Sequence, residues 1–189
     1  MQVITLTLLL MLSFATFSGD VVPGPEKAFE SRMDFLSVIK LDFENKDLYF
    51  SQIGEAERKF LFFSIYDVAY YLSEANDDGL QGSALLIQYK RDIAVKKIHA
   101  ALTDGFKENI NAKGFKLIEP KLERLLEKID KDITEGDILL MYKLLDGRVL
   151  FYFNNQLLLA IQGQIFAETL WSIWLGKNAV VNNVKLTNP

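Results

Sequence analysis

Residues 59–72 carry the pattern that most constrains the fold of this chain. β-Branched and aromatic side chains dominate the run, and successive side chains of a strand point to opposite faces. Both faces here are apolar, since one set of alternating positions holds Phe60, Phe62, Tyr66, Val68 and Tyr70, and the other holds Leu61, Phe63, Ile65, Ala69 and Tyr71. The run therefore predicts one long strand whose two faces are both covered.

The rest of the chain alternates between strand and helix patterns. Asp92 suits the N-cap of a first helix, Pro120 suits the start of a second, and Gly176 suits the end of a last one. Asp146–Gly147 and Asn154–Asn155 suit two tight turns of a three-stranded meander. The expected strands are 35–43, 47–53, 59–72, 84–90 and the meander within 136–163; the expected helices run from 93 to about 111, from 120 onward, and over 163–175.

This order segregates most strands from the helices. Strands, two helices, three strands and a helix favour the α+β class, an antiparallel sheet with helices packed over part of it. At 189 residues, with half of them apolar, the chain can bury a core as one domain.

The first residues have the composition of a secretory signal. An apolar run from residue 3 to 12 is followed by small residues, and no charged side chain occurs before Asp20. We expect a signal peptide at 1–18, a linker at 19–31 and a domain at 32–189, in a secreted, periplasmic protein. An uncleaved N-terminal anchor is the alternative, although the run is shorter than the ~20 residues that a span needs.

Composition excludes several function classes. The formal net charge of −4 comes from acidic and basic residues mixed along the chain, which disfavours nucleic-acid binding. The chain has no cysteine and one histidine, His99, which lies beside Lys96 and Lys97 and is expected at the surface. We therefore expect no metal and no cofactor, and after the first residues no membrane span.

Arg58 is the strongest candidate for a binding residue. On a strand it shares a face with Phe60, Phe62, Ser64 and Tyr66. An arginine on an aromatic wall can bind a carboxylate or enolate while the aromatic rings hold an apolar tail. The alternative is an arginine in a turn before the strand, solvated or paired with a neighbouring glutamate.

Three stretches resemble the bacterial chalcone isomerase-like proteins. They are "GEAERKFLFFSIYDVAYYL", "LLIQYKRDIAVKKIHAALTDGF" and "GDILLMYKLLDGRVLFYFNNQLLLAIQGQIFAETLWSIWLG", in the order and at the separations usual in that family. The resemblance implies an open-faced β-sandwich, in which a large antiparallel sheet carries a layer of helices. It also implies that Arg58 faces a cleft between sheet and helices, where such an arginine stabilises an oxyanion in the plant enzymes and anchors a fatty-acid carboxylate in related plastid proteins.

The other catalytic positions of those enzymes do not carry over. Tyr66 stands where the enzymes have a threonine, and the last-helix hydroxyl falls near Ile173, with Ser172 one place away. The helical tyrosine and asparagine of the enzymes fall around residues 93–95 and 100–102, which hold neither residue type. Loss of such acid–base groups typically removes ~10² to 10⁴ in rate.

The leading hypothesis is therefore a non-catalytic protein that binds a small apolar anion, such as a fatty acid. Arg58 is its expected anchor, Tyr66 a second polar contact, and Ser64 and Phe62 further ligand-binding residues. One alternative is an isomerase or lyase acting on an enone-like substrate through Arg58 and Tyr66. Another is a cell-envelope interaction module that docks through tryptophans of the last helix.

Overall fold

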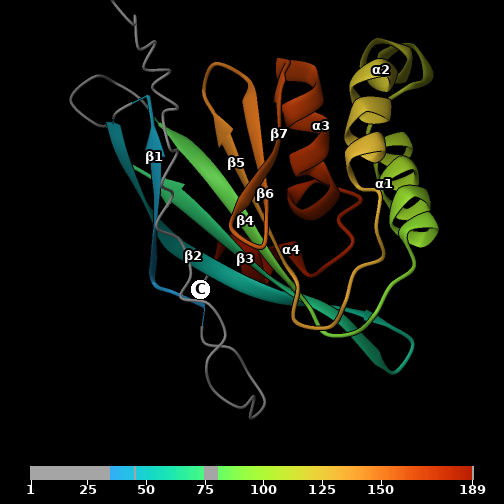
Figure 1. The fold of residues 1–189 in the computed structure, drawn as a ribbon, viewed down its shortest axis with the longest axis horizontal. Coiled ribbons are helices and arrows are strands. Elements are labelled where there is room, and N and C mark those ends of the chain that lie inside the picture. The colour runs from blue at the N-terminus through green and yellow to red at the C-terminus, as the bar shows by residue number, and fades with distance from the viewer. Residues whose placement is uncertain (1–34, 45, 75–80, 189) are drawn as a thin grey trace, which may run out of the picture.

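The computed structural model describes residues 35–44, 46–74 and 81–188. The expected signal peptide at 1–18 and linker at 19–31 lie outside the described residues. Within the described part, seven strands form one antiparallel sheet in which each strand pairs with the next one along the chain (Figure 1). The strands are β1 (Val38–Phe43), β2 (Lys46–Phe60), β3 (Phe63–Ser73), β4 (Gly82–Tyr89), β5 (Ile138–Leu144), β6 (Arg148–Phe153) and β7 (Gln156–Gln162).

Three longer helices cover one face of this sheet (Figure 1). Two of them connect β4 to β5, and the third follows β7. A short fourth helix packs on β2 and β3. The helices are α1 (Val95–Asn109), α2 (Ala112–Lys128), α3 (Gln164–Leu175) and α4 (Asn183–Thr187). The expected α+β class and the helix-covered antiparallel sheet are confirmed.

The helix-covered face of the sheet holds the larger of two apolar cores. Phe106 of α1 and Phe166 of α3 are both fully buried, and their ring centroids lie 5.1 Å apart. Side chains of one parity from β3 to β7 complete this core, because alternate residues of a strand share a face.

The opposite face of the sheet is covered by the sheet's own first strands. β1 and the start of β2 curl over β5 and β6, so that the rings of Phe50 and Tyr142 lie 5.0 Å apart. The Tyr142 hydroxyl donates a hydrogen bond to the Lys40 carbonyl at 3.1 Å. Strands β3 to β6 are therefore covered on both faces, which explains why their apolar residues occupy both parities.

The single long strand expected at 59–72 is wrong. Residues 59–60 end β2, Leu61 and Phe62 form a turn, and β3 returns antiparallel from Phe63. The run therefore divides into two strands of one hairpin. The division was hidden because neither turn residue is Gly, Asn or Asp, the residue types that favour a two-residue hairpin turn.

The predicted helix starts also need correction. Helix α1 begins after Ala94, while the Asp92 side chain instead accepts a hydrogen bond from the Glu135 backbone N–H at 2.9 Å. Helix α2 begins after Asn111, which caps the N–H of Gly114, so that Pro120 lies inside the helix. The Asn111 cap supplies the start signal that we assigned to the proline.

The meander and the last helix agree with the sequence-based expectation. Strands β5, β6 and β7 turn at Asp146–Gly147 and at Asn154–Asn155, and Gly176 follows α3. His99, expected at the surface, is half-buried instead, and its Nε2 lies 2.8 Å from the Ile129 carbonyl at the end of α2. None of the helices in the described ranges is both long and apolar enough to span a bilayer.

Candidate functional site

Arg58 and Tyr66 face each other across the β2–β3 hairpin. They are register partners on neighbouring strands, and directly opposed residues project from the same face of a sheet. A register shift follows immediately, between Arg58 and Lys59. The two residues thus meet as a cross-strand pair and not, as the one-strand prediction supposed, eight positions apart on a single strand.

The Arg58 side chain reaches the segment that joins α3 to α4. It is half-buried, and its Nη1 donates a hydrogen bond to the Val180 carbonyl at 2.5 Å. The C-terminal segment also packs closely on β2, so closely that a Cβ atom at Gly54 would collide with the Lys185 carbonyl oxygen. Glycine at position 54 therefore allows the C-terminal segment to lie against the strand that carries Arg58.

Tyr66 is held from the helix layer. The Trp174 indole N–H of α3 donates to the Tyr66 hydroxyl at 3.0 Å, and the ring of Tyr89 on β4 meets that of Tyr66 edge-on at 5.9 Å. Burial raises the pKa of Tyr66 to about 12, and the Trp174 hydrogen bond and the positive charge of Arg58 oppose that rise. Tyr66 therefore keeps its proton at neutral pH.

This pair can hold an anion. A guanidinium offers five N–H donors, and one of those of Arg58 goes to a neutral carbonyl. The Tyr66 oxygen accepts from Trp174, so its own proton is available for an acceptor near Arg58. A carboxylate or enolate would receive charge-assisted hydrogen bonds, which are about twice as strong as neutral ones.

Two other predicted ligand-binding residues lie away from this pair. Phe62 is at the tip of the hairpin and is 95% exposed. Ser64 donates a hydrogen bond to Glu57, on the exposed side of the hairpin. The structure thus brings together Arg58 and Tyr66 from the expected set and does not bring Ser64 and Phe62 to them.

Sequence reasoning missed three neighbours of the pair: Tyr89, Trp174 in its role as a donor, and the Val180 carbonyl. Tyr89 could have been found, since a strand pairing next to 63–73 places one of its residues opposite Tyr66. The Val180 contact carries no signal in the sequence. Trp171 and Trp174 are both less than 5% exposed, so neither offers the docking surface that the interaction-module hypothesis assigned to them.

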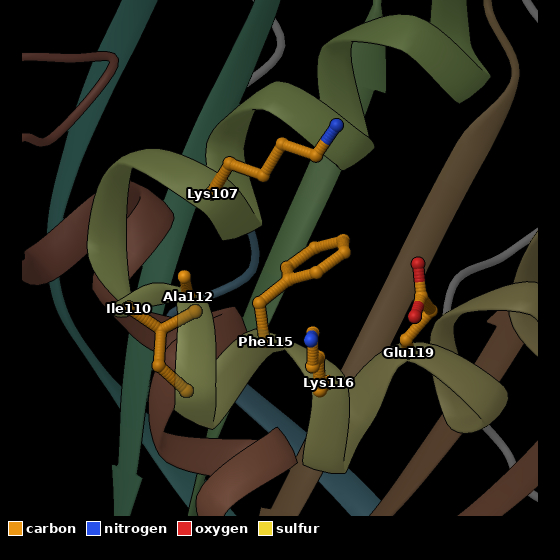
Figure 2. Close-up of a pocket in the computed structure, with 6 residues that line it drawn as sticks. All are labelled: Lys107, Ile110, Ala112, Phe115, Lys116 and Glu119. Carbon is orange, nitrogen blue, oxygen red and sulfur yellow. The ribbon is translucent and has the colours of Figure 1, made fainter.

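A separate pocket opens between the end of α1 and the start of α2 (Figure 2). Its volume is about 360 Å³, and it is lined by Lys107, Ile110, Ala112, Phe115, Lys116 and Glu119. In Figure 2 the Phe115 ring points toward Lys107, whose Nζ lies 5.4 Å from the ring centroid. This pocket shares no residue with the Arg58–Tyr66 pair.

No metal centre is evident in the part of the chain that the structure describes. There, no three His, Asp or Glu side chains gather closely enough to hold an ion. The Arg58–Tyr66 pair itself presents a cation, a protonated phenol and the aromatic rings around them.

Comparison with known proteins identifies the family. A family model described as chalcone isomerase-like matches residues 38–187. The chain belongs to the chalcone isomerase-like family. A solved structure, a fatty-acid binding protein of Arabidopsis thaliana, superposes with a TM-score of 0.60 at 9% identity, covering 72% of this chain and 84% of that one. No curated protein matches the sequence. The low identity means that the superposition shows a shared fold, the open-faced sandwich expected from the sequence.

Proposed function

We propose that this chalcone isomerase-like protein binds a small apolar anion, such as a fatty acid, between its sheet and its helices. Arg58 holds the anionic group, and Tyr66 donates a second hydrogen bond to it. The observation that carries the proposal is the cross-strand pairing of these two side chains on the helix-covered face. The binding of fatty acid by a protein of the same fold supports this choice of ligand.

The anion takes the place of the Val180 carbonyl. Exchange is favourable because a carboxylate accepts a stronger hydrogen bond from a guanidinium than a neutral carbonyl does. The segment between α3 and α4 must then move away from Arg58, which links ligand entry to a displacement of residues 177–182.

The test is a calorimetric titration with laurate and, in parallel, with dodecanol as its neutral isostere. Arg58→Ala should weaken laurate binding at least tenfold, or about 1.4 kcal/mol, and should leave dodecanol binding nearly unchanged. Lys107→Ala, in the α1–α2 pocket, is the matched control and should leave both affinities as they are. Equal laurate affinity in wild type and Arg58→Ala, or no binding by the wild type, would show that the proposal is wrong.

An isomerase or lyase acting on an enone-like substrate is the second candidate. It is supported by the protonated Tyr66 beside a cation, which together could donate to a developing enolate. Against it, the Ser172 hydroxyl donates to the Glu168 carbonyl of its own helix. Turnover of enone-like compounds, lost in both Arg58→Ala and Tyr66→Phe, would favour catalysis over passive binding.

We also propose export from the cell to the periplasm, on the support of the apolar run near the N-terminus and the small residues that follow it. Fractionation of the producing cells, with the intact mass of the recovered protein, tests this. A mass lower by residues 1–18 in the exported fraction is the expected result, and recovery of full-length protein in the cytoplasm alone would contradict it.

A further inference from the structure

The tip of the β2–β3 hairpin exposes four consecutive large apolar side chains. The exposed fractions are 62% for Phe60, 75% for Leu61, 95% for Phe62 and 58% for Phe63. Strand β3 pairs with β4 only from Tyr66 onward, so this tip extends past its neighbour in the sheet. In Figure 1 the teal end of the hairpin projects beyond the rest of the molecule. An exposed apolar patch of this kind marks an interaction site.

The turn at the tip has apolar side chains although its backbone conformation favours other residue types. Leu61 has a φ of 55°, in the left-handed region that a bulky side chain rarely occupies. The β6–β7 hairpin of the same chain has Asn154 and Asn155 at its positive-φ positions, with φ of 47° and 65°. Asparagine is the residue type usually found at such a position. Leucine at position 61 therefore strains the backbone, and the strained residue is one of the four that form the exposed patch.

Cationic side chains flank the tip. The Arg91 guanidinium lies over the Phe63 ring at 5.1 Å from its centroid. Lys59 precedes the apolar run, and its side chain is 59% exposed while its Nζ contacts Glu57 at 2.9 Å. An apolar tip with basic side chains beside it matches the chemistry of a bilayer surface, where acyl chains lie beneath anionic headgroups.

We propose that the hairpin tip, residues 60–63, inserts into the surface of a lipid bilayer that contains anionic lipids. The shape of the tip favours a bilayer over a protein partner, because a convex apolar tip needs a matching groove in a protein but none in a fluid bilayer. Aromatic side chains enter the interface, and Arg91 and Lys59 meet the phosphate groups. The inference does not depend on the ligand proposed for Arg58.

The cysteine-free chain allows a direct test. A single cysteine is introduced by Phe62→Cys in the full chain and labelled with an environment-sensitive fluorophore; Leu145→Cys, at an exposed leucine of the β5–β6 turn, is the matched control. With vesicles of phosphatidylcholine and phosphatidylglycerol, the label at 62 should shift to the blue and be quenched by brominated acyl chains. The label at 145 should do neither.

Two outcomes of this labelling experiment would overturn the proposal. One is the absence of a shift at position 62, or an equal shift at both positions, which would indicate no insertion or non-specific adsorption. The other is a shift at 62 that follows protein concentration without lipid, which would make a second copy of the chain the partner.

A second variant separates binding from folding. Leu61→Asn places a residue suited to the positive φ at the turn, so its denaturation midpoint should equal or exceed that of the wild type. Its affinity for the phosphatidylglycerol vesicles should fall at least fivefold, measured by co-sedimentation, while Leu145→Asn keeps the wild-type affinity. A stable Leu61→Asn protein that binds the vesicles as the wild type does would overturn the proposal.

Discussion

The Arg58–Tyr66 pair and the α1–α2 pocket differ in how their cations are held. Arg58 projects from a paired strand, is half-buried and is bonded to a distant backbone carbonyl. Lys107 and Lys116 of the pocket lie on helix surfaces and are exposed, although the pocket offers a volume of about 360 Å³. In this molecule, open volume and a fixed positive charge therefore occur at different places. A ligand that must be oriented needs the fixed charge, because ordering a lysine side chain costs rotamer entropy.

The largest expected difference between the two regions concerns their glycines. A Cβ at Gly54 meets the backbone of Lys185 and Leu186, whereas a Cβ at Gly114 meets the flexible side chain of Ile110. Gly54→Val should therefore lower the free energy of unfolding by about 3 kcal/mol. Gly114→Ala should change it by less than about 1 kcal/mol, since better helix propensity offsets the crowding. Urea denaturation of both variants measures these changes, and equal losses of stability would contradict the expected difference in packing around the two glycines.

Alkaline titration gives the next largest effect. The pKa of Tyr66 is about 12 in the native state, above the ordinary tyrosine value of about 10, so the unfolded chain loses this proton first as pH rises. The stabilisation from the raised pKa is complete below pH 10 and is lost as pH rises to about 12, for a total on the order of 3 kcal/mol. Tyr66→Phe should reduce the loss of stability between about pH 9 and 12 by up to that amount.

Chemical denaturation at several pH values measures this loss. Tyr49→Phe, at an exposed position of β2, controls for removal of a phenol. If Tyr66→Phe and wild type lose stability in parallel over this range, Tyr66 ionises in the native state as easily as in the unfolded chain, and its burial contributes nothing.

A smaller effect is expected from the hydrogen bond that orients Tyr66. Trp174→Phe keeps an aromatic ring but removes the indole N–H and part of a buried side chain, and it should lower the free energy of unfolding by about 2 kcal/mol. Because this bond lowers the pKa of Tyr66, its loss should also raise that pKa further. The absorbance of tyrosinate during an alkaline titration reports the shift. An unchanged titration curve would show that the Trp174 hydrogen bond does not affect the ionisation of Tyr66.

The smallest effect belongs to the pocket. Lys107→Ala removes a cation over the Phe115 ring at an exposed site, where such a contact contributes about 0.5–1 kcal/mol. Thermal denaturation should show a correspondingly small drop. If Lys107→Ala lost more stability than Trp174→Phe, the contacts of the pocket would contribute more to stability than those around Tyr66, contrary to expectation.

The parts of the fold that were predictable are those with a local signal. The meander was marked by Asp146–Gly147 and Asn154–Asn155, of which Gly147, Asn154 and Asn155 have the positive φ that suits those residue types. The β2–β3 turn was not found, because Leu61 and Phe62 continue the apolar pattern without a turn residue. Local propensity fails to predict a turn where, as at residues 61 and 62, the residue types are not those that favour the turn conformation.

The candidate site was predictable only in part, for a similar reason. Parity along one supposed strand placed Arg58 and Tyr66 on a common face, and the hairpin places them there by cross-strand pairing. The same parity grouped Phe62 and Ser64 with them, but Phe62 lies in the turn, and Ser64 lies beyond the register shift and donates to Glu57. The carbonyl that binds Arg58 comes from a segment 122 residues away, a separation at which spacing carries no information.

That separation also sets the order in which the site can form during synthesis. Val180 and α4 follow all seven strands, so β2 and β3 can be paired while Arg58 still lacks its carbonyl partner. Contacts between segments so far apart form late, because the intervening chain must first be ordered. Until that segment has been synthesised and has packed on β2, Arg58 lacks its Val180 acceptor and would be accessible to the anion that we propose as its ligand.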